Sequence, residues 1–254
     1  MHRVKPFLSS LPRPVAFAHR GGARAYPENT LYAFEKALNL HGMHVLELDV
    51  HSTKDGVLVV AHDDTVDRCT DAKGPIAGFT LRELKALNAA AKFPEAGRVE
   101  VPTLDEVLTA FPKARLNIEL KHEGPEAQFI RALEPHAARV CVGSEHDAVA
   151  ARLAELAPDM CRFYPAQAAL QVAMGVWGAG PLEADPRYDV LEVPYEFGGE
   201  VVATKKFFDA TAKLGVPVFV WVVDDENVMR SLITDGAAGV MTDLPAVLQK
   251  VVGG

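Results

Sequence analysis

Residues 45–50, Val-Leu-Glu-Leu-Asp-Val, are the stretch from which both the fold and the chemistry can be inferred. Side chains alternate between the two faces of a β-strand, so Leu46 and Leu48 face one way while Glu47 and Asp49 face the other. The two carboxylates then start about 7 Å apart at the backbone and can lean onto one ion. Such a pair suits Mg²⁺ or Ca²⁺. The alternative is a half-exposed strand whose acids face water.

Composition limits the class of protein. The chain has 254 residues, of which 49% are hydrophobic, enough to bury a large core, and its net charge is −8. No run of Lys and Arg appears, so we expect no nucleic-acid partner. The three cysteines, Cys69, Cys141 and Cys161, are odd in number and lack C-x-x-C spacing. This pattern argues against a disulfide framework or a thiolate zinc site and favours a reducing compartment.

Prolines interrupt the beginning of the chain. Pro6, Pro12 and Pro14 come before any apolar run reaches the length of a signal peptide. No stretch elsewhere approaches the roughly 18 apolar residues of a membrane span. We therefore expect a cytoplasmic protein without stable membrane association. The oligomeric state stays open at this point.

Two histidines stand at the ends of predicted strands. Residues 15–19 form the first strand, which finishes at His19. Residues 57–61 form a later strand, and His62 follows it directly. Both imidazoles are therefore delivered at strand ends, where loops begin.

The stretch from about residue 64 to 102 breaks the regular alternation of strands and helices. It contains turn residues and one short predicted helix, which Thr80 opens with Glu83 as a capping box. This stretch reads as an excursion from a repeat. Because it begins directly after His62, we expect it to lie beside that histidine.

Polar side chains recur on one face of later strands. Residues 116–121 place Glu119 and Lys121 on the face opposite their leucines, so a third inward acid appears. By the same alternation Glu192 and Trp221 face inward from two further strands.

Eight main strands, each followed by a helix, predict a (β/α)₈ TIM barrel, whose active site lies at the carboxyl ends of its strands. We expect one domain over residues 1–254, with a small insertion after the second barrel strand at about 52–102. A doubly wound open sheet is the competing fold, but the turn after His19 is not a G-x-G-x-x-G fingerprint. The strands are expected at 15–19, 45–50, 116–121, 139–144, 160–164, 189–193, 217–223 and 239–243.

Several motifs together resemble the glycerophosphodiester phosphodiesterase family over nearly the whole chain. They are His19-Arg20-Gly21-Gly22, Pro27-Glu28-Asn29-Thr30, Glu47-x-Asp49, Thr53-Lys54-Asp55-Gly56, Val59-Val60-Ala61-His62-Asp63, Glu119-x-Lys121, and Trp221 with Thr242-Asp243. The resemblance implies a TIM barrel with an inserted segment. It also implies one divalent metal ion held by Glu47, Asp49 and Glu119, and catalytic histidines at His19 and His62.

The chemistry of phosphodiester hydrolysis agrees with these residue types. The reaction needs positive charge on the nonbridging oxygens, which a metal ion, Arg20 and Lys121 can supply. It also needs one group that activates the nucleophile and one that protonates the leaving alkoxide. An imidazole with a pKa of about 6.5 can do either, so the assignment of His19 and His62 stays open.

Three other residues are candidates for substrate binding. Glu28 either orients a catalytic group or caps the start of the following helix. Trp221 either forms an aromatic wall against glycerol or fills the core, and Glu192 could contact a substrate hydroxyl.

Three functions follow from different classes. The first is metal-dependent hydrolysis of small glycerophosphodiesters to glycerol 3-phosphate and an alcohol. The second is lysophospholipase D-type cleavage of lysolipid head groups, which needs an exposed apolar rim, for which residues 172–181 are the candidate. The third is a noncatalytic barrel that binds phosphorylated ligands, against which the paired acid–base groups argue.

Overall fold

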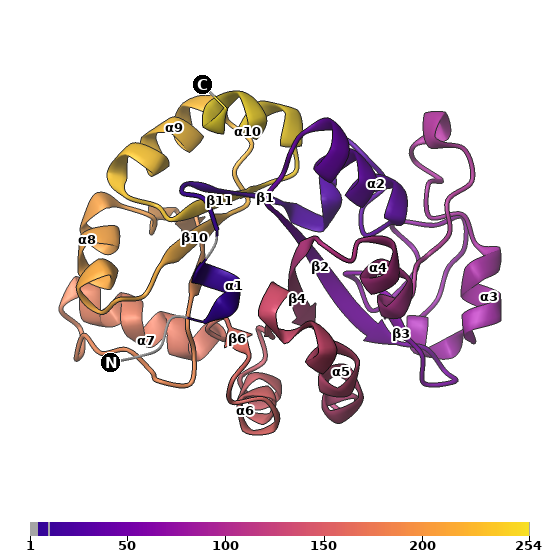
Figure 1. Ribbon diagram of the computed structural model, residues 1–254, viewed down its shortest axis with the longest axis horizontal. Coiled ribbons are helices and arrows are strands. Elements are labelled where there is room, and N and C mark those ends of the chain that lie inside the picture. The colour runs from indigo at the N-terminus through magenta and orange to yellow at the C-terminus, as the bar shows by residue number, and fades with distance from the viewer. Residues whose placement is uncertain (1–4, 10, 254) are drawn as a thin grey trace.

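The computed structural model describes residues 5–9 and 11–253 and contains a barrel of parallel strands (Figure 1). These are β1 (Val15–Ala18), β2 (Val45–Ser52), β4 (Arg115–Leu120), β5 (Val140–Gly143), β6 (Cys161–Arg162), β7 (Leu191–Pro194), β10 (Val218–Trp221) and β11 (Gly239–Thr242). Their hydrogen-bonded order is β6-β5-β4-β2-β1-β11-β10-β7. A parallel bridge between Phe163 and Val190 joins the two ends of this series. The predicted TIM barrel is confirmed, although several strands are shorter than expected.

Helices cover the outside of the barrel (Figure 1). After β1, helix α2 (Leu31–Glu35) continues as a π-helical turn over Lys36–Leu40, so its hydrogen-bonding pattern changes midway. The Thr30 hydroxyl caps α2 by accepting the Ala33 N–H. The remaining outer helices are α4 (Leu104–Ala110), α5 (Glu126–Leu133), α6 (Asp147–Leu156), α7 (Ala166–Trp177), α8 (Lys205–Lys213), α9 (Glu226–Asp235) and α10 (Pro245–Val252). Short 3₁₀ turns span His19–Gly21 and Glu134–Arg139.

The two faces of each barrel strand contribute to different apolar clusters. Leu46 and Leu48 of β2 pack outward among the helices, together with the outer residues of the other strands. Val45 of the same strand points inward and packs with Phe17 and Phe219, whose ring centroids lie 4.7 Å apart. The predicted alternation along β2 is therefore confirmed, and it directs the polar residues of the strand into the barrel.

The segment after β2 forms a side lobe with a small apolar cluster of its own (Figure 1). Its first strand, β3 (Leu58–Val60), pairs antiparallel with the end of β2. The lobe also contains α3 (Leu81–Ala86), with the predicted capping box at Thr80, and 3₁₀ turns at Ile76–Gly78 and Pro94–Ala96. The cluster consists of Val59, Val66, Ile76, Leu84, Ala89 and Val101. This lobe begins where β2 delivers its acids, so it borders the barrel mouth.

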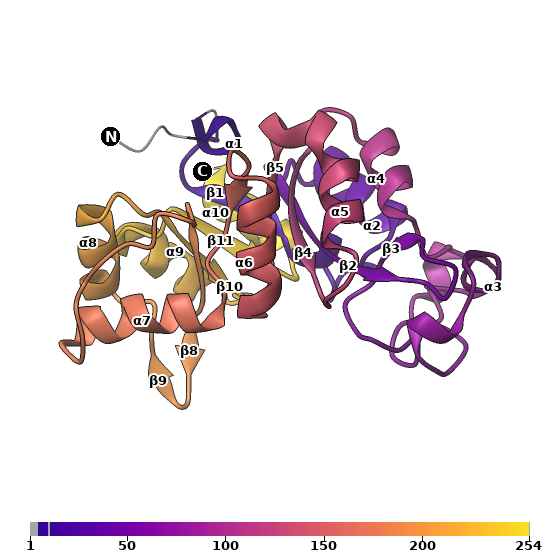
Figure 2. The same ribbon diagram turned by 90° about the horizontal axis from the view of Figure 1, so that it is seen from below.

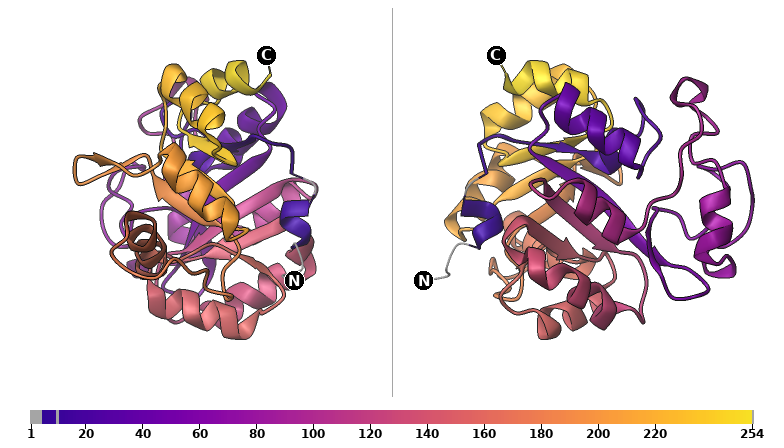
Figure 3. Two further views of the ribbon diagram at one scale, coloured as in Figure 1. Left: turned by 90° about the vertical axis from the view of Figure 1, so that its left-hand side faces the viewer. Right: turned by 45° about the vertical axis from the view of Figure 1, so that its right-hand side comes forward.

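Two small elements were not predicted. Helix α1 (Pro6–Ser9) buries Phe7 completely in the inner cluster at the amino ends of the strands. The hairpin of β8 (Glu196–Phe197) and β9 (Glu200–Val201) projects from the opposite end of the barrel, because it follows the carboxyl end of β7 (Figures 2 and 3). Within the described residues, no helix is both long and apolar enough to cross a membrane.

Candidate active site

Three carboxylates meet inside the barrel at the carboxyl ends of two neighbouring strands. Glu47 and Asp49 lie on the inward face of β2, and the parallel register places Glu119 of β4 beside Asp49. Their side chains are 9%, 2% and 17% exposed, respectively. The three acids implied as metal ligands are thus brought together in one enclosed place.

Nitrogen donors contact two of these carboxylates from several sides. The Glu145 N–H donates to Glu119 Oε1 at 3.0 Å, and the Asn29 amide donates to Asp49 Oδ2 at 3.0 Å. Lys121 Nζ lies 3.1 Å from Glu119 Oε2 and 3.7 Å from Asp49 Oδ1. Lys121 therefore bridges the acids of β2 and β4.

Arg20 approaches the same acids from the end of β1. Its N–H donates to Glu47 Oε2 at 2.9 Å, and its Nε lies 3.4 Å from Asp49 Oδ2. Arg20 and Asn29 both adopt positive φ angles, 51° and 57°, and the Asn29 N–H donates to the Arg20 carbonyl at 2.9 Å. Non-glycine residues in this region are strained, and such strain concentrates at functional sites.

The donor set fits a hard divalent cation. Burial, followed by repulsion from Asp49, raises the pKa of Glu47 well above its usual range, and burial raises the pKa of Glu119. A divalent cation would relieve this cost of enclosing several acids, and carboxylate oxygens are its preferred ligands. Among the described residues, no three acidic, histidine or cysteine side chains form a ready-made metal cage. Lys121 instead contacts two of the three acids.

His19 is oriented by an aspartate from the far end of the chain. Its Nδ1 lies 2.7 Å from Asp243 Oδ1, and its Nε2 lies 3.9 Å from Glu47 Oε2. Because a carboxylate only accepts, Nδ1 donates and Nε2 is left for chemistry. The Asp243 N–H and the Thr242 hydroxyl both donate to Asp224 Oδ1, at 2.9 and 2.8 Å. Asp224 thus fixes the loop that carries Asp243.

His62 has a parallel arrangement built from the inserted lobe. Its Nδ1 lies 2.7 Å from Asp63 Oδ1, and Arg68 donates to both oxygens of Asp63. His51 Nε2 donates to the His62 carbonyl at 3.0 Å, and its ring stacks on that of His122 with centroids 5.4 Å apart. Side-chain contacts therefore hold His62 on two sides.

Glu28 joins two arginines, Arg20 from the end of β1 and Arg68 from the inserted lobe. Its carboxylate accepts from Arg20 Nη1 at 3.3 Å and from Arg68 Nη2 at 2.8 Å. Although burial opposes ionisation, the hydrogen bonds and charges of these arginines hold the pKa of Glu28 below its usual range. The Thr30 hydroxyl caps the helix start, whereas the Glu28 carboxylate binds the two arginines.

The two other candidates lie on the far side of the barrel from His62. The enclosed Glu192 accepts from the Asn117 side-chain amide at 2.9 Å, and burial raises the pKa of Glu192 to about 8. Trp221 ends β10 beside Pro194 and is 40% exposed, so it stands at the rim rather than filling the core. Neither residue contacts the three carboxylates directly through a described hydrogen bond.

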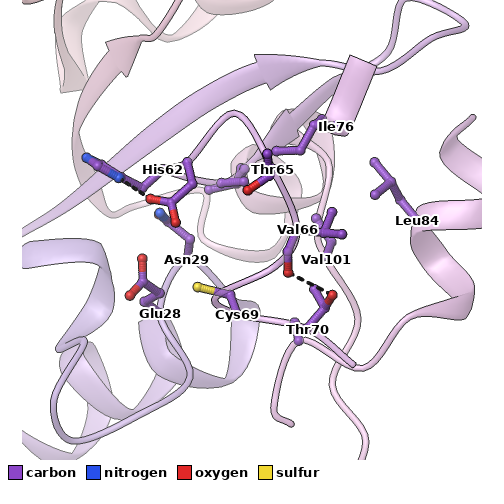
Figure 4. Close-up of a pocket in the computed structure, with 14 residues that line it drawn as sticks. Glu28, Asn29, His62, Thr65, Val66, Cys69, Thr70, Ile76, Leu84 and Val101 are labelled. Carbon is purple, nitrogen blue, oxygen red and sulfur yellow. Dashed lines mark hydrogen bonds and ion pairs between the residues drawn. The ribbon is translucent and has the colours of Figure 1, made fainter. Parts of the chain in front are cut away.

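A small cavity of about 30 Å³ separates His62 from the apolar interior of the lobe (Figure 4). Glu28, Asp63 and Cys69 line it on the side of the site, and Val66 and other apolar residues line it on the side of the lobe. Packing is therefore incomplete behind His62.

Sequence reasoning assigned no role to three residues that the structure places at the histidines. Asp63 and Asp243 stood within the recognised motifs, and each follows the end of a strand, which was the available signal. Arg68 lies in the excursion, where no periodic pattern pointed to it.

Comparisons with known proteins show which family the chain is similar to. The profile of the glycerophosphoryl diester phosphodiesterase family matches residues 19–247. A glycerophosphodiester phosphodiesterase of Caldanaerobacter subterraneus is 34% identical, over 94% of this chain and 98% of its own. A lysophospholipase D of Rattus norvegicus is 27% identical, over 92% of this chain and 84% of its own.

Solved structures of similar proteins share the fold. A glycerophosphodiester phosphodiesterase of Agrobacterium tumefaciens is 26% identical with a TM-score of 0.78, covering 93% of this chain and 99% of its own. An Oleispira antarctica phosphodiesterase, solved with sn-glycerol-3-phosphate, is 27% identical with a TM-score of 0.76, covering 96% and 98%. Together with the profile match, these likenesses show that the chain belongs to the glycerophosphoryl diester phosphodiesterase family and is a phosphodiesterase.

Proposed function

We propose that this chain hydrolyses glycerophosphodiesters to glycerol 3-phosphate and an alcohol, with one divalent metal ion, Mg²⁺ or Ca²⁺, bound by Glu47, Asp49 and Glu119. The observation that carries this proposal is the gathering of three enclosed carboxylates with His19, which lies 3.9 Å from Glu47, and with His62, which is linked to the same acids through Asp63, Arg68, Glu28 and Arg20. Acid–base groups and an oxygen-rich cation site at one barrel mouth suit phosphodiester cleavage.

His19 and His62 divide the proton transfers. One imidazole takes a proton from the attacking nucleophile, and the other gives a proton to the leaving alkoxide as its bond to phosphorus breaks. Each ring has its Nδ1 bound to an aspartate, so the proton is exchanged at Nε2. A substrate with a better leaving group needs no proton on its leaving oxygen. It should therefore rescue only the variant that lacks the histidine acting as general acid.

Cationic side chains among the acids balance the negative charge of the phosphate. Lys121 and Arg20 lie among the acids and carry positive charge toward the nonbridging oxygens. A bound divalent cation would polarise the phosphoryl oxygens at the same place. Glu28 keeps the Arg20 guanidinium in position.

We assign the glycerol side to Trp221 and Glu192. Trp221 offers an aromatic surface at the rim, and Glu192 offers a carboxyl to a glycerol hydroxyl. Glycerol 3-phosphate in the Oleispira relative supports a product of this size. The lobe beside His62 would limit long acyl chains, so we propose small water-soluble diesters as substrates, handled in the cytoplasm, where the three free cysteines stay reduced.

Lysophospholipase D-type cleavage is the second candidate. The apolar rim expected over residues 172–181 is present in part, since Met174 and Trp177 are exposed. Phe197 and Val201 of the hairpin after β7 add further exposed apolar surface. The hairpin stands at the mouth end of the barrel, where an acyl chain would emerge (Figure 2). This observation, with the rat relative, favours the candidate.

Release of glycerol 3-phosphate from glycerophosphocholine, with and without a chelator, tests the proposal. We expect activity that chelation abolishes and added Mg²⁺ or Ca²⁺ restores, and an Asp49→Asn variant that folds but is inactive. Full activity after exhaustive chelation would refute the proposed dependence on a metal ion. We expect kcat/KM for glycerophosphocholine and glycerophosphoethanolamine to agree within about tenfold, or about 1.4 kcal/mol. A higher value for lysophosphatidylcholine would favour the second candidate.

A further inference from the structure

Arg68 links the inserted lobe to the barrel through two carboxylates. Its Nε lies 2.7 Å from Asp63 Oδ2 and its Nη2 lies 2.9 Å from Asp63 Oδ1. Nη2 also lies 2.8 Å from Glu28 Oε1, and Nη1 donates to Glu28 Oε2. The planar guanidinium therefore binds both carboxylates in paired fashion, a geometry that lysine cannot reproduce.

These contacts set the position of Asp63. Both of its oxygens are engaged by Arg68, and Oδ1 also accepts from His62 Nδ1. The hydrogen bonds from Arg68 hold the pKa of Asp63 far below its usual range, so Asp63 remains an acceptor. A fixed acceptor defines both the orientation of the His62 ring and the nitrogen that carries its proton.

Backbone hydrogen bonds hold the ends of the segment that carries Asp63, since the Ala61 N–H donates to the Asp49 carbonyl at 3.0 Å and the Ile76 N–H donates to the Asp64 carbonyl at 2.8 Å, but they do not set the direction of the Asp63 carboxylate. Residues 61–71 form no helix or strand apart from one bridge, between Thr65 and Pro75. The cavity of about 30 Å³ lies directly behind His62 and Asp63 (Figure 4). Val66, by contrast, is buried in the apolar cluster of the lobe, so it anchors the turn that presents Arg68.

We propose that Arg68 is a positioning residue of the phosphodiesterase, which acts on His62 through Asp63 and gives the inserted lobe a direct part in the reaction. This inference rests on the proposed function, in which His62 transfers a proton. Arg68 does not touch the substrate. Glu28, the second carboxylate that Arg68 binds, also accepts from Arg20.

Steady-state kinetics of Arg68→Met and Arg68→Lys give the first test. We expect kcat to fall roughly 10- to 100-fold in both, the usual range for a residue that orients a catalytic group, with KM changed less than about threefold. Arg82→Met is the matched control, because Arg82 is an arginine on α3 in the same lobe. Unchanged kcat in Arg68→Met, or an equal loss in Arg82→Met, would overturn the proposal.

A double-mutant cycle with His62→Ala separates positioning from general destabilisation. If Arg68 acts through His62, Arg68→Met has no further effect on kcat once the imidazole is gone. Additive losses would show that Arg68 acts by another route and would reject the proposal.

Chemical rescue covers the case in which a variant folds poorly. The Arg68 side chain is 39% exposed, so added methylguanidinium can reach the gap left by Arg68→Ala. We expect it to restore at least about a third of the lost kcat in Arg68→Ala and none in His62→Ala, and the absence of rescue in folded Arg68→Ala would count against the proposal.

A spectroscopic readout separates this inference from the proposed function. The Nδ1 proton of a histidine bound to a carboxylate gives a downfield proton resonance, which His62→Gln identifies by its loss. We expect that resonance to disappear in Arg68→Met and to persist in Arg82→Met. If the wild-type chain released no glycerol 3-phosphate, the proposed function would be wrong. If the resonance persisted in Arg68→Met while the wild type remained active, only the proposed positioning of His62 by Arg68 would be wrong.

Discussion

The two histidines are oriented by similar chemistry but by different parts of the fold. We call His19 with Asp243 and Asp224 the His19 cluster, and His62 with Asp63, Arg68 and Glu28 the His62 cluster. In the His19 cluster, β1 and β11 pair over four residues and bring His19 and Asp243 together.

The His62 cluster has no such ladder behind it. β3 spans three residues, and in the loop that follows Arg68 donates to both oxygens of Asp63. The side chains of His19 and Asp243 are 14% and 18% exposed, whereas those of His62 and Asp63 are 31% and 29% exposed. The difference teaches that a paired backbone brings one imidazole to its aspartate, whereas an arginine binds the aspartate of the other.

The largest expected effect comes from removing each imidazole. His19→Ala and His62→Ala should each lower kcat by roughly 10²- to 10⁴-fold, the usual range for one proton-transfer group, with little change in metal affinity. A substrate with a better leaving group should rescue only the variant that lacks the general acid. Circular dichroism and the variant His136→Ala, on the outer surface between α5 and β5, serve as controls. A histidine whose removal leaves kcat unchanged is structural.

Replacement of Glu192, inside the barrel, should change the stability of the fold without affecting one histidine cluster more than the other. Since burial raises the pKa of Glu192 from near 4.5 to about 8, the folded chain retains a proton that the unfolded chain loses across this range. Stability should therefore fall as the pH rises from about 4.5 to 8 and level off above it.

Glu192→Gln should flatten this dependence and raise Tm at pH 8 relative to the wild type, by about 2–4 °C for each kcal/mol recovered. Thermal unfolding in chelator at several pH values measures it. Parallel pH profiles of Tm for the variant and the wild type would contradict the expectation.

The smallest expected effect comes from Arg24, which contacts Asp224 of the His19 cluster. Arg24 Nη1 lies 3.1 Å from Asp224 Oδ2, but its side chain is 63% exposed, and Asp224 is held independently by Thr242 and the Asp243 N–H. Exposed ion pairs contribute about 0–1 kcal/mol. Arg24→Met should therefore lower kcat by less than about threefold. A loss as large as that of Arg68→Met would erase the difference between the two clusters.

Local periodicity predicted much of the site. Side chains alternate with a period of two that the backbone imposes, so the inward directions of Glu47, Asp49 and Glu119 followed from their neighbours alone. Strand ends likewise located His19 and His62. The barrel followed from eight repeats of strand and helix.

Contacts that depend on register or on irregular loops could not be predicted in this way. Asp243 lies 224 positions from His19, and only the pairing of β1 with β11 makes them neighbours. Arg68 stands in a segment without periodicity, so its distance from Asp63 depends on the packing of the lobe. The hairpin of β8 and β9 is too short, at two residues a strand, to leave a pattern.

The position of helix α1 has a practical consequence. Phe7 closes the barrel at the amino ends of the strands, and α10 runs back antiparallel to β11, so both ends of the described chain lie at that end (Figure 2). The catalytic mouth and the hairpin after β7 face the other way. A surface or a fusion partner attached at either end would therefore leave the mouth open to solvent, and immobilised enzyme would present its substrate entrance to the flowing solution.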